Sequence, residues 1–238
     1  MTDKTALYLL PGLLCDATVW ADVAAGLHDL AEIRTPDFLG YDSITEMARS
    51  VLATAPPTFA VVGHSMGARV ALEIVRLAPG RVERLALLDT GTHAQREGEP
   101  ASRQVLVDLA SAEGMQALAA RWLPPMVHPD TPADGELMKS LQAMVGRATP
   151  EIFAGQVRAL LARPDAERGL SAIRCPVLIG VGRQDAWSPP SQHEAMAAAI
   201  AHADYVVFEN SGHMAPMEAP QAVISALRGW LTAERTVS

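Results

Sequence analysis

The chain has little cysteine and no long hydrophobic run. Its two cysteines, Cys15 and Cys175, fit neither a disulfide framework nor a zinc-site pattern, so we expect free thiols in a reducing compartment. No apolar stretch approaches the ~20 residues that span a bilayer. Pro11-Gly12 interrupts the apolar N-terminal segment, which favours a buried strand and a turn over a signal sequence. We therefore expect a cytoplasmic protein that does not act at a membrane.

Positive charge is scarce as well, and no cofactor motif is present. The 238 residues include 19 lysines and arginines against 27 aspartates and glutamates, a net charge of −8. An acidic surface argues against nucleic acid as a partner. No histidine or cysteine pair has metal-ligand spacing, and no glycine-rich loop carries the lysine of a phosphate-binding loop, so we expect neither a metal nor another cofactor. Hydrophobic residues make up 49%, enough for a large core.

Short apolar runs alternate with helical patterns along most of the chain. The runs predict strands near residues 6–10, 31–35, 58–63, 83–89, 176–182 and 204–209. The helical spacings predict helices near residues 17–28, 43–55, 66–78, 191–201 and 219–233. This alternation is typical of an α/β fold, a mostly parallel sheet of about six strands flanked by helices.

The alternation stops between about residues 92 and 172. This stretch has helical apolar spacings, several prolines and no strand pattern, which predicts about four helices. We interpret residues 92–172 as a helical cap, inserted into a core formed by residues 1–91 and 173–238. Because α/β sheets bind ligands at the carboxyl ends of their strands, an insertion there would cover the ligand site.

The pentapeptide Gly63-His64-Ser65-Met66-Gly67 follows one predicted strand and opens a predicted helix. Gly-x-Ser-x-Gly in that context is typical of a nucleophile elbow, where a sharp turn presents the serine at its apex. The flanking glycines leave room for the neighbouring strand and helix. Ser65 is thus the candidate nucleophile, and His64 is expected to pack beside it and not to act as a base.

A serine hydroxyl needs a base, and the base needs an acid. His213 lies in the loop after the last predicted strand, and Asp185 lies in the loop after the preceding one. The chain order Ser65, Asp185, His213 is one in which such triads occur. Asp89, at the end of an earlier strand, is the alternative acid.

An oxyanion needs two backbone N–H donors. One is expected from Met66, the residue after the serine. The other is expected from the loop after the first strand, from Leu13 or, one residue on, from Leu14, because Gly12 lets that loop turn towards the serine.

Together these segments resemble the α/β-hydrolase superfamily over nearly the whole chain. The specific parts are the elbow, the segment Gly182-Arg183-Gln184-Asp185 and the segment from Gly212-His213 to Glu218-Ala219-Pro220. The resemblance implies a parallel sheet with a helical cap, and an activity like that of carboxylesterases or enol-lactone hydrolases with short caps. The chain departs from the family at Pro11-Gly12, where His-Gly is usual. Because only a few residues precede the first predicted strand, we also expect the antiparallel strands that often open this fold to be absent.

The remaining pocket residues are assigned more loosely. We expect an acyl pocket lined by Leu14, Trp122, Met126, Phe153 and Trp187, although packing between helices is the default explanation for the cap residues among them. Arg69, on the helix after Ser65, is interpreted as half of a structural ion pair, with a substrate contact as the alternative.

These observations favour a serine hydrolase that cleaves a small to medium carboxylic ester or lactone through an acyl-enzyme on Ser65. A carbon–carbon bond hydrolase with the same triad is an alternative, and perhydrolase activity is a further side reaction of such sites. A non-catalytic ligand receptor on the same fold is the alternative from a different class. The sequence predicts no particular oligomeric state.

Overall fold

The computed structural model describes residues 4–234, which contain one sheet of six parallel strands in the order β2-β1-β3-β4-β5-β6. The strands are β1 (Thr5–Leu10), β2 (Ala31–Arg34), β3 (Phe59–His64), β4 (Val82–Leu88), β5 (Val177–Gly182) and β6 (Ala203–Phe208). Each lies within about two residues of its predicted range, and the predicted mostly parallel sheet of about six strands is confirmed.

The central strands are buried along their whole length. Every residue of β3 and of β5 is buried, whereas β6, at the edge of the sheet, is fully buried only at Phe208. Helices cover both faces of the central strands, and this explains why those strands read as continuous apolar runs in the sequence.

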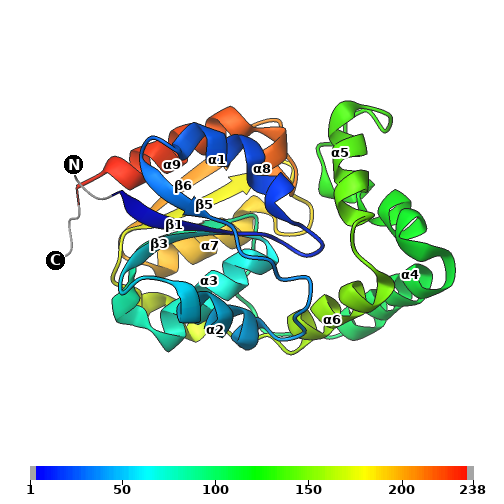
Figure 1. The fold of residues 1–238 in the computed structure, drawn as a ribbon, viewed down its shortest axis with the longest axis horizontal. Coiled ribbons are helices and arrows are strands. Elements are labelled where there is room, and N and C mark those ends of the chain that lie inside the picture. Colours follow the sequence, from blue (N-terminus) through cyan, green and yellow to red (C-terminus); the bar gives the residue numbers. More distant parts are fainter. Residues whose placement is uncertain (1–3, 235–238) are drawn as a thin grey trace.

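Helices form a layer on each face of the sheet, as Figure 1 shows. One layer contains α1 (Ala21–Leu27), α8 (Ala215–Glu218) and α9 (Pro220–Thr232), and the other contains α2 (Ile44–Thr54), α3 (Met66–Leu77) and α7 (Pro190–Ala199). Short 3₁₀ helices at Ala17–Trp20 and Pro79–Arg81 join them to the strands. The short helix α8 has no counterpart among the predicted helices.

Between β4 and β5 the chain forms helices and no strand. These are α4 (Glu99–Trp122), α5 (Glu136–Val145) and α6 (Pro150–Leu161), with 3₁₀ turns at Pro124–Met126 and Glu167–Ala172. Helix α4 breaks at Gly114, whose φ of 84° and ψ of 174° are not helical, so it is two helices end to end. Figure 1 places α4, α5 and α6 beyond the carboxyl ends of the strands. The division into a core and a cap at residues 92 and 172 stays a prediction.

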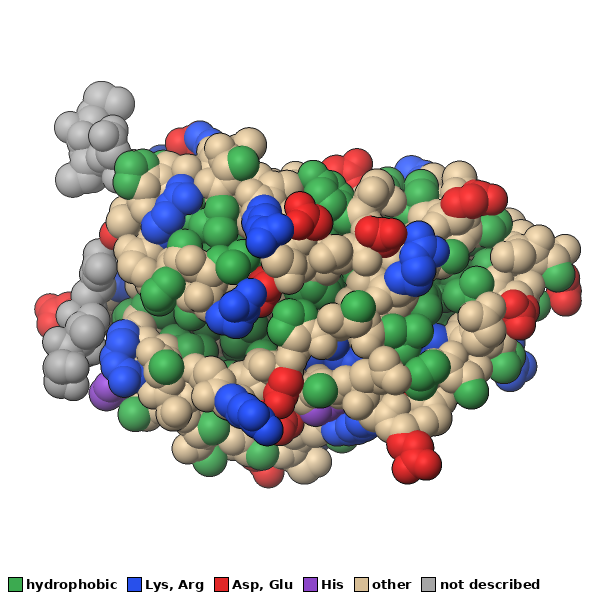
Figure 2. Space-filling model, turned by 90° about the horizontal axis from the view of Figure 1, so that it is seen from below, with side chains coloured by type: hydrophobic (Ala, Val, Ile, Leu, Met, Phe, Trp, Pro, Cys, Tyr) green, Lys and Arg blue, Asp and Glu red, His purple; other side chains and the backbone are tan. Residues whose placement is uncertain are grey.

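The face of the molecule formed by α2, α3 and α6 carries mixed charge. Figure 2, which shows the side of α2, α3 and α6, has acidic and basic side chains interspersed around a hollow with hydrophobic side chains at its base. Among the described residues, no helix has both the length and the apolar character that crossing a membrane requires.

Candidate active site

Ser65 stands at a strained turn between β3 and α3. Its φ of 53° and ψ of −115° are rare for a residue with a side chain. A methyl group on Gly63 would lie 2.4 Å from Cα of Ala68, and one on Gly67 would lie 2.1 Å from the carbonyl oxygen of Leu10. Both positions therefore need glycine, since the backbone of the neighbouring elements approaches this closely.

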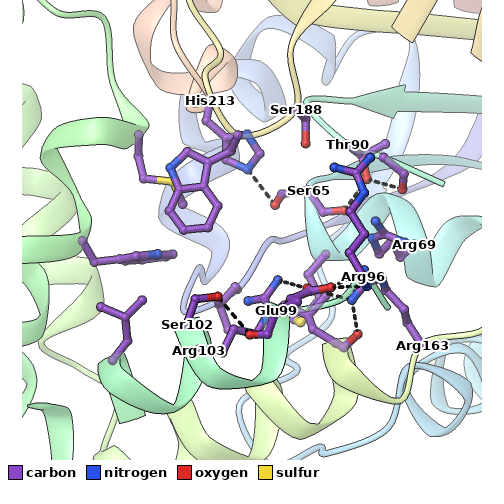
Figure 3. A pocket seen from close by; sticks show the side chains of 18 of the residues that line it. Ser65, Arg69, Thr90, Arg96, Glu99, Ser102, Arg103, Arg163, Ser188 and His213 are labelled. Atoms are coloured by element: carbon purple, nitrogen blue, oxygen red, sulfur yellow. Dashed lines mark hydrogen bonds and ion pairs between the residues drawn. The ribbon is translucent and has the colours of Figure 1, made fainter. Parts of the chain in front are cut away.

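A continuous chain of hydrogen bonds links the three polar residues that the sequence singles out. Oγ of Ser65 lies 2.8 Å from Nε2 of His213, and Nδ1 of His213 lies 2.7 Å from Oδ2 of Asp185. The three residues follow β3, β6 and β5, and the parallel sheet brings the ends of those strands together. Figure 3 shows His213 facing Ser65 across the pocket.

The environment of Asp185 favours its ionised form. Burial would raise the pKa of this carboxyl group, but the charge and hydrogen bond of His213 outweigh burial and lower the pKa below its usual value. The backbone N–H groups of Trp187 and Ser188 also donate to Oδ1 of Asp185, at 2.8 and 2.9 Å. The carboxylate is therefore fixed in position and ionised, facing the imidazole ring.

The loop that carries His213 is held by a half-buried glutamate. The carboxylate of Glu218 accepts hydrogen bonds from the backbone N–H groups of Gly212, Met214 and His128, at 2.9, 3.1 and 2.5 Å. The sequence flagged Glu218 only as part of a motif, and its role as an acceptor for backbone amides was missed. The contact with His128 joins the loop to the helical insertion.

His64 packs beneath the site, as expected. Its Nε2 donates to the carbonyl oxygen of His213 at 2.7 Å, and burial lowers its pKa to about 3. The ring is neutral, its Nδ1 has no hydrogen-bond partner among the described residues, and the hydroxyl group of Ser65 bonds His213 instead.

Asp89 does not contact His213, and its nearest histidine is His64. Its Oδ1 accepts from the backbone N–H of Gly182 at 2.9 Å, while its Oδ2 lies 3.8 Å from Nε2 of His64 and has no hydrogen-bond partner among the described residues. Burial and the nearby charge of Asp185 raise the pKa of Asp89 well above its usual value. Asp185 is thus the acid that the geometry joins to His213.

Two backbone amides near Ser65 have no hydrogen-bond partner among the described residues, and a third is bonded elsewhere. No acceptor among the described residues takes a hydrogen bond from the N–H of Leu13 or of Met66. The N–H of Leu14 instead donates to the side chain of Gln156, on α6, at 2.8 Å. Leu14 is therefore not available as the alternative donor, and Leu13 is.

A pocket of about 650 Å³ opens in front of Ser65. Leu13, Met66, His213 and the predicted residues Trp122, Met126 and Trp187 line it. Leu14 and Phe153 were expected there but do not line it. Both side chains are about 1% exposed and belong to the hydrophobic core, and Leu14 has a positive φ of 58°.

Arg69 also lines this pocket, and the structure places no carboxylate within ion-pair distance of it in the described part of the chain. Nη1 of Arg69 donates to the carbonyl oxygen of His93 at 2.9 Å. The interpretation of Arg69 as half of an ion pair was therefore wrong. The acidic partner nearest in the pocket, Glu99, is bonded to Arg103 and Arg163 instead.

Across residues 4–234, no group of three or more histidine, cysteine or acidic side chains is arranged to hold a metal ion. Cys15 donates weakly to the carbonyl oxygen of Leu13, and burial raises the pKa of its thiol to about 12. This thiol is therefore not a nucleophile at neutral pH.

The fold and this site are those of a hydrolase of the α/β type. Residues 7–226 match the model of the alpha/beta hydrolase family, and the chain belongs to that family. A pimeloyl-(acyl-carrier protein) methyl ester esterase of Aliivibrio salmonicida is 25% identical over 96% of this chain and 92% of its own length.

Solved structures agree in fold. A thermophilic esterase from Thermogutta terrifontis, in a malate-bound form, superposes with a TM-score of 0.88 at 28% identity and covers 96% of this chain and 90% of its own. The enol-lactonase from Burkholderia xenovorans has a TM-score of 0.88 at 24% identity and covers 97% of this chain and 92% of its own.

Proposed function

We propose that the protein cleaves a small to medium carboxylic ester or lactone through an acyl-enzyme on Ser65. The observation that carries this proposal is the unbroken hydrogen-bond chain from Ser65 through His213 to Asp185, with distances of 2.8 and 2.7 Å. Such a chain converts a weakly nucleophilic hydroxyl group into one that can attack a carbonyl carbon.

The bonding of His213 fixes which nitrogen acts as the base. Asp185 is ionised and accepts only, so Nδ1 of His213 carries the proton and Nε2 presents a lone pair to the Ser65 hydroxyl. His213 takes the hydroxyl proton as Ser65 attacks the carbonyl and then gives it to the leaving alkoxide. Water repeats the sequence and releases the acid.

The amides of Leu13 and Met66 are the proposed oxyanion donors. Met66 is the first residue of α3, so its N–H has no partner within the helix. The hydrogen bond from Leu14 to Gln156 holds the neighbouring loop, which keeps the amide of Leu13 aimed at the site.

The walls of the pocket set the size and polarity of the acyl group. Trp122 and Met126 are buried apolar walls, whereas Trp187 is 41% exposed and stands at the opening. A cavity of about 650 Å³ accommodates a small to medium substrate. The esterase and enol-lactonase names of similar proteins support ester or lactone chemistry for this chain as well.

The test compares hydrolysis of p-nitrophenyl esters, from acetate to decanoate, by the wild type and by Ser65→Ala. We expect kcat to fall by about 10⁴-fold or more in the variant, since removing a triad nucleophile leaves only binding and oxyanion stabilisation. Ser111→Ala, on the exposed side of α4, is the matched control and should retain wild-type turnover.

The chain-length optimum would give the depth of the acyl pocket. A wild type that hydrolyses none of these esters, nor a simple lactone, would overturn the ester and lactone proposal. A carbon–carbon bond hydrolase and a non-catalytic ligand receptor would then be the remaining alternatives. Activity that persists in Ser65→Ala would overturn the acyl-enzyme.

A further inference from the structure

The pocket in front of Ser65 is rich in arginine although the protein is acidic overall. Five arginines and two glutamates line this pocket, while the whole chain has a net charge of −8. Figure 3 shows Arg69, Arg96, Arg103 and Arg163 gathered with Glu99 on the wall formed by α3 and the start of α4. Their bonding separates arginines that hold the wall together from arginines that are free to bind.

Arg163 is a structural residue. Its side chain is 1% exposed, and its guanidinium group bonds both carboxylate oxygens of Glu99, at 2.7 and 2.9 Å. It also donates to the backbone carbonyl groups of His93, Ala94 and Leu160. Nearly all of its donors are used, so it has none to offer a ligand.

Both carboxylate oxygens of Glu99 accept hydrogen bonds within the same network. It also pairs with Arg103 at 2.8 Å. Burial would raise the pKa of Glu99, but the hydrogen bonds from Arg163, the backbone N–H of Arg96 and Arg103 outweigh it and lower the pKa to about 2. One carboxylate therefore serves two arginines, and no negative charge in this network is left for Arg69.

Arg69 is the half-buried arginine of this pocket that has no carboxylate partner among the described residues. It lies one helical turn after Ser65, and its only acceptor in the described part of the chain is the carbonyl oxygen of His93. Burial and the neighbouring charge of Arg163 lower its pKa to about 9, so the group remains charged at neutral pH. A half-buried guanidinium with unused donors is unfavourable, and an anion in the pocket would relieve that cost.

Arg96 adds a second positive charge at the rim of the pocket. Its side chain is exposed, and no carboxylate in the described residues pairs with it. Glu97 and Arg121 also line the pocket, and they offset each other in charge.

We propose that this pocket takes acyl substrates that carry a free carboxylate, and that Arg69 binds the carboxylate while Arg96 attracts it from the rim. This inference rests on the proposed hydrolase function and specifies its substrate class, namely half-esters of dicarboxylic acids or lactones bearing an acid group. The planar guanidinium of Arg69 can hold a carboxylate through two parallel hydrogen bonds, one helical turn from the nucleophile.

The test is a selectivity ratio, kcat/KM for monomethyl adipate divided by kcat/KM for dimethyl adipate. The two esters share an acyl skeleton and differ by one charge. The wild type should prefer the half-ester, and Arg69→Gln should lower the ratio about 10–100-fold, mainly through KM, because hydrogen bonds to a charged group are lost. Arg69→Lys should recover part of the ratio, since lysine keeps the positive charge but cannot donate two parallel hydrogen bonds to one carboxylate.

Arg49→Gln, which removes an exposed arginine of α2 paired with Glu46, is the charge-matched control and should leave the ratio unchanged. If Arg69→Gln does not fold, Arg96→Gln serves in its place, and we expect a drop of about threefold because the rim charge is more screened. Adipate should also inhibit the wild type more strongly than inorganic phosphate at equal ionic strength.

The outcomes separate the two proposals. A wild type inactive on both adipate esters and on p-nitrophenyl esters defeats the hydrolase proposal. Carboxylate recognition is overturned, with the hydrolase proposal intact, if the wild type has equal kcat/KM for the diester and the half-ester. The same follows if Arg69→Gln leaves the ratio unchanged. Equal inhibition by phosphate would overturn the assignment to carboxylates.

Discussion

Two pairs of an aspartate and a histidine lie behind Ser65, and they are bonded differently. In the first pair, Asp185 and His213 are 2.7 Å apart and His213 faces the serine. In the second, Asp89 and His64 are 3.8 Å apart, and His64 donates to the backbone of His213 instead. Both pairs contain the residue types of a catalytic dyad, so residue type alone does not decide which pair acts.

The polar contacts of each pair indicate which of the two can act as a catalytic dyad. Two backbone amides and an imidazole donate to Asp185, and these contacts lower its pKa, whereas burial raises the pKa of Asp89 and burial lowers the pKa of His64 to about 3. The first pair is thus stabilised with a charged carboxylate, and the second is stabilised as two neutral groups. The fold provides hydrogen bonds for one ionised acid at this edge of the sheet.

Among substitutions in these two pairs, the largest expected effect is that of Asp185→Asn. An amide in place of the carboxylate would orient His213 wrongly and leave the imidazolium without its counter-charge, so kcat/KM should fall by about 10⁴-fold. Steady-state kinetics on the best p-nitrophenyl ester measures it. A loss below tenfold would show that Asp89 or another group serves as the acid.

A smaller effect is expected from His64→Leu. The change leaves the carbonyl oxygen of His213 without its buried donor, which costs about 1–3 kcal/mol of unfolding free energy and about tenfold in kcat/KM. Urea unfolding and steady-state kinetics give the two values. His64→Gln, which keeps an N–H donor, should recover part of both, and equal losses in the two variants would contradict the role given to this hydrogen bond.

The buried histidines also make stability depend on pH. The pKa of His64 in the folded protein is about 3 and that of His193 about 4, both lowered by burial, against ~6.5 in an unfolded chain. Below about pH 6.5 the unfolded chain binds a proton at each of these histidines and the folded protein does not. The unfolding free energy therefore decreases by about 1.4 kcal/mol per histidine for each unit by which the pH is lowered.

Asp89 acts in the opposite sense. Because its folded-state pKa is raised, the stability it contributes is present at low pH and is lost as the pH rises. Urea unfolding at about pH 7, 6 and 5 should therefore show a shallower slope for His193→Gln than for the wild type and a steeper one for Asp89→Asn. If the unfolding free energy of all three proteins had the same dependence on pH, the assignment of neutral histidines would be contradicted.

The smallest effect on activity is expected from Asp89→Asn. An asparagine resembles the neutral acid in shape and can still accept from the N–H of Gly182, so kcat/KM should change by less than about threefold. The contrast with Asp185→Asn is the direct test of the comparison between the two pairs. A large loss here would mean that Asp89 is ionised and takes part in the reaction.

Local patterns in the sequence predicted the strands, the elbow and the positions of Ser65, Asp185 and His213. Apolar runs mark buried strands, and the elbow needs glycine where a side chain would clash, so both leave a direct signal. Contacts between distant segments leave none. The bond from Leu14 to Gln156 spans 142 residues and that from His128 to Glu218 spans 90, and no spacing rule predicts either.

The role of Arg69 was mispredicted for the same reason. A single charged residue on a helix does not reveal its partner, and the carboxylate of Glu99, in the same pocket, is bonded to two other arginines. The pocket roles of Leu14 and Phe153 were also assigned from position alone, and backbone direction and core packing took both side chains elsewhere.

The place of the helical insertion has a kinetic consequence. Strands β2, β1, β3 and β4 all precede Leu88, whereas β5 begins at Val177 and pairs with β4 only after the long intervening segment closes on itself. Ser65 belongs to the first group of strands, and Asp185 and His213 follow the second. Long-range pairing of this kind is slow. In a refolding experiment, activity should therefore not return before β4 and β5 have joined.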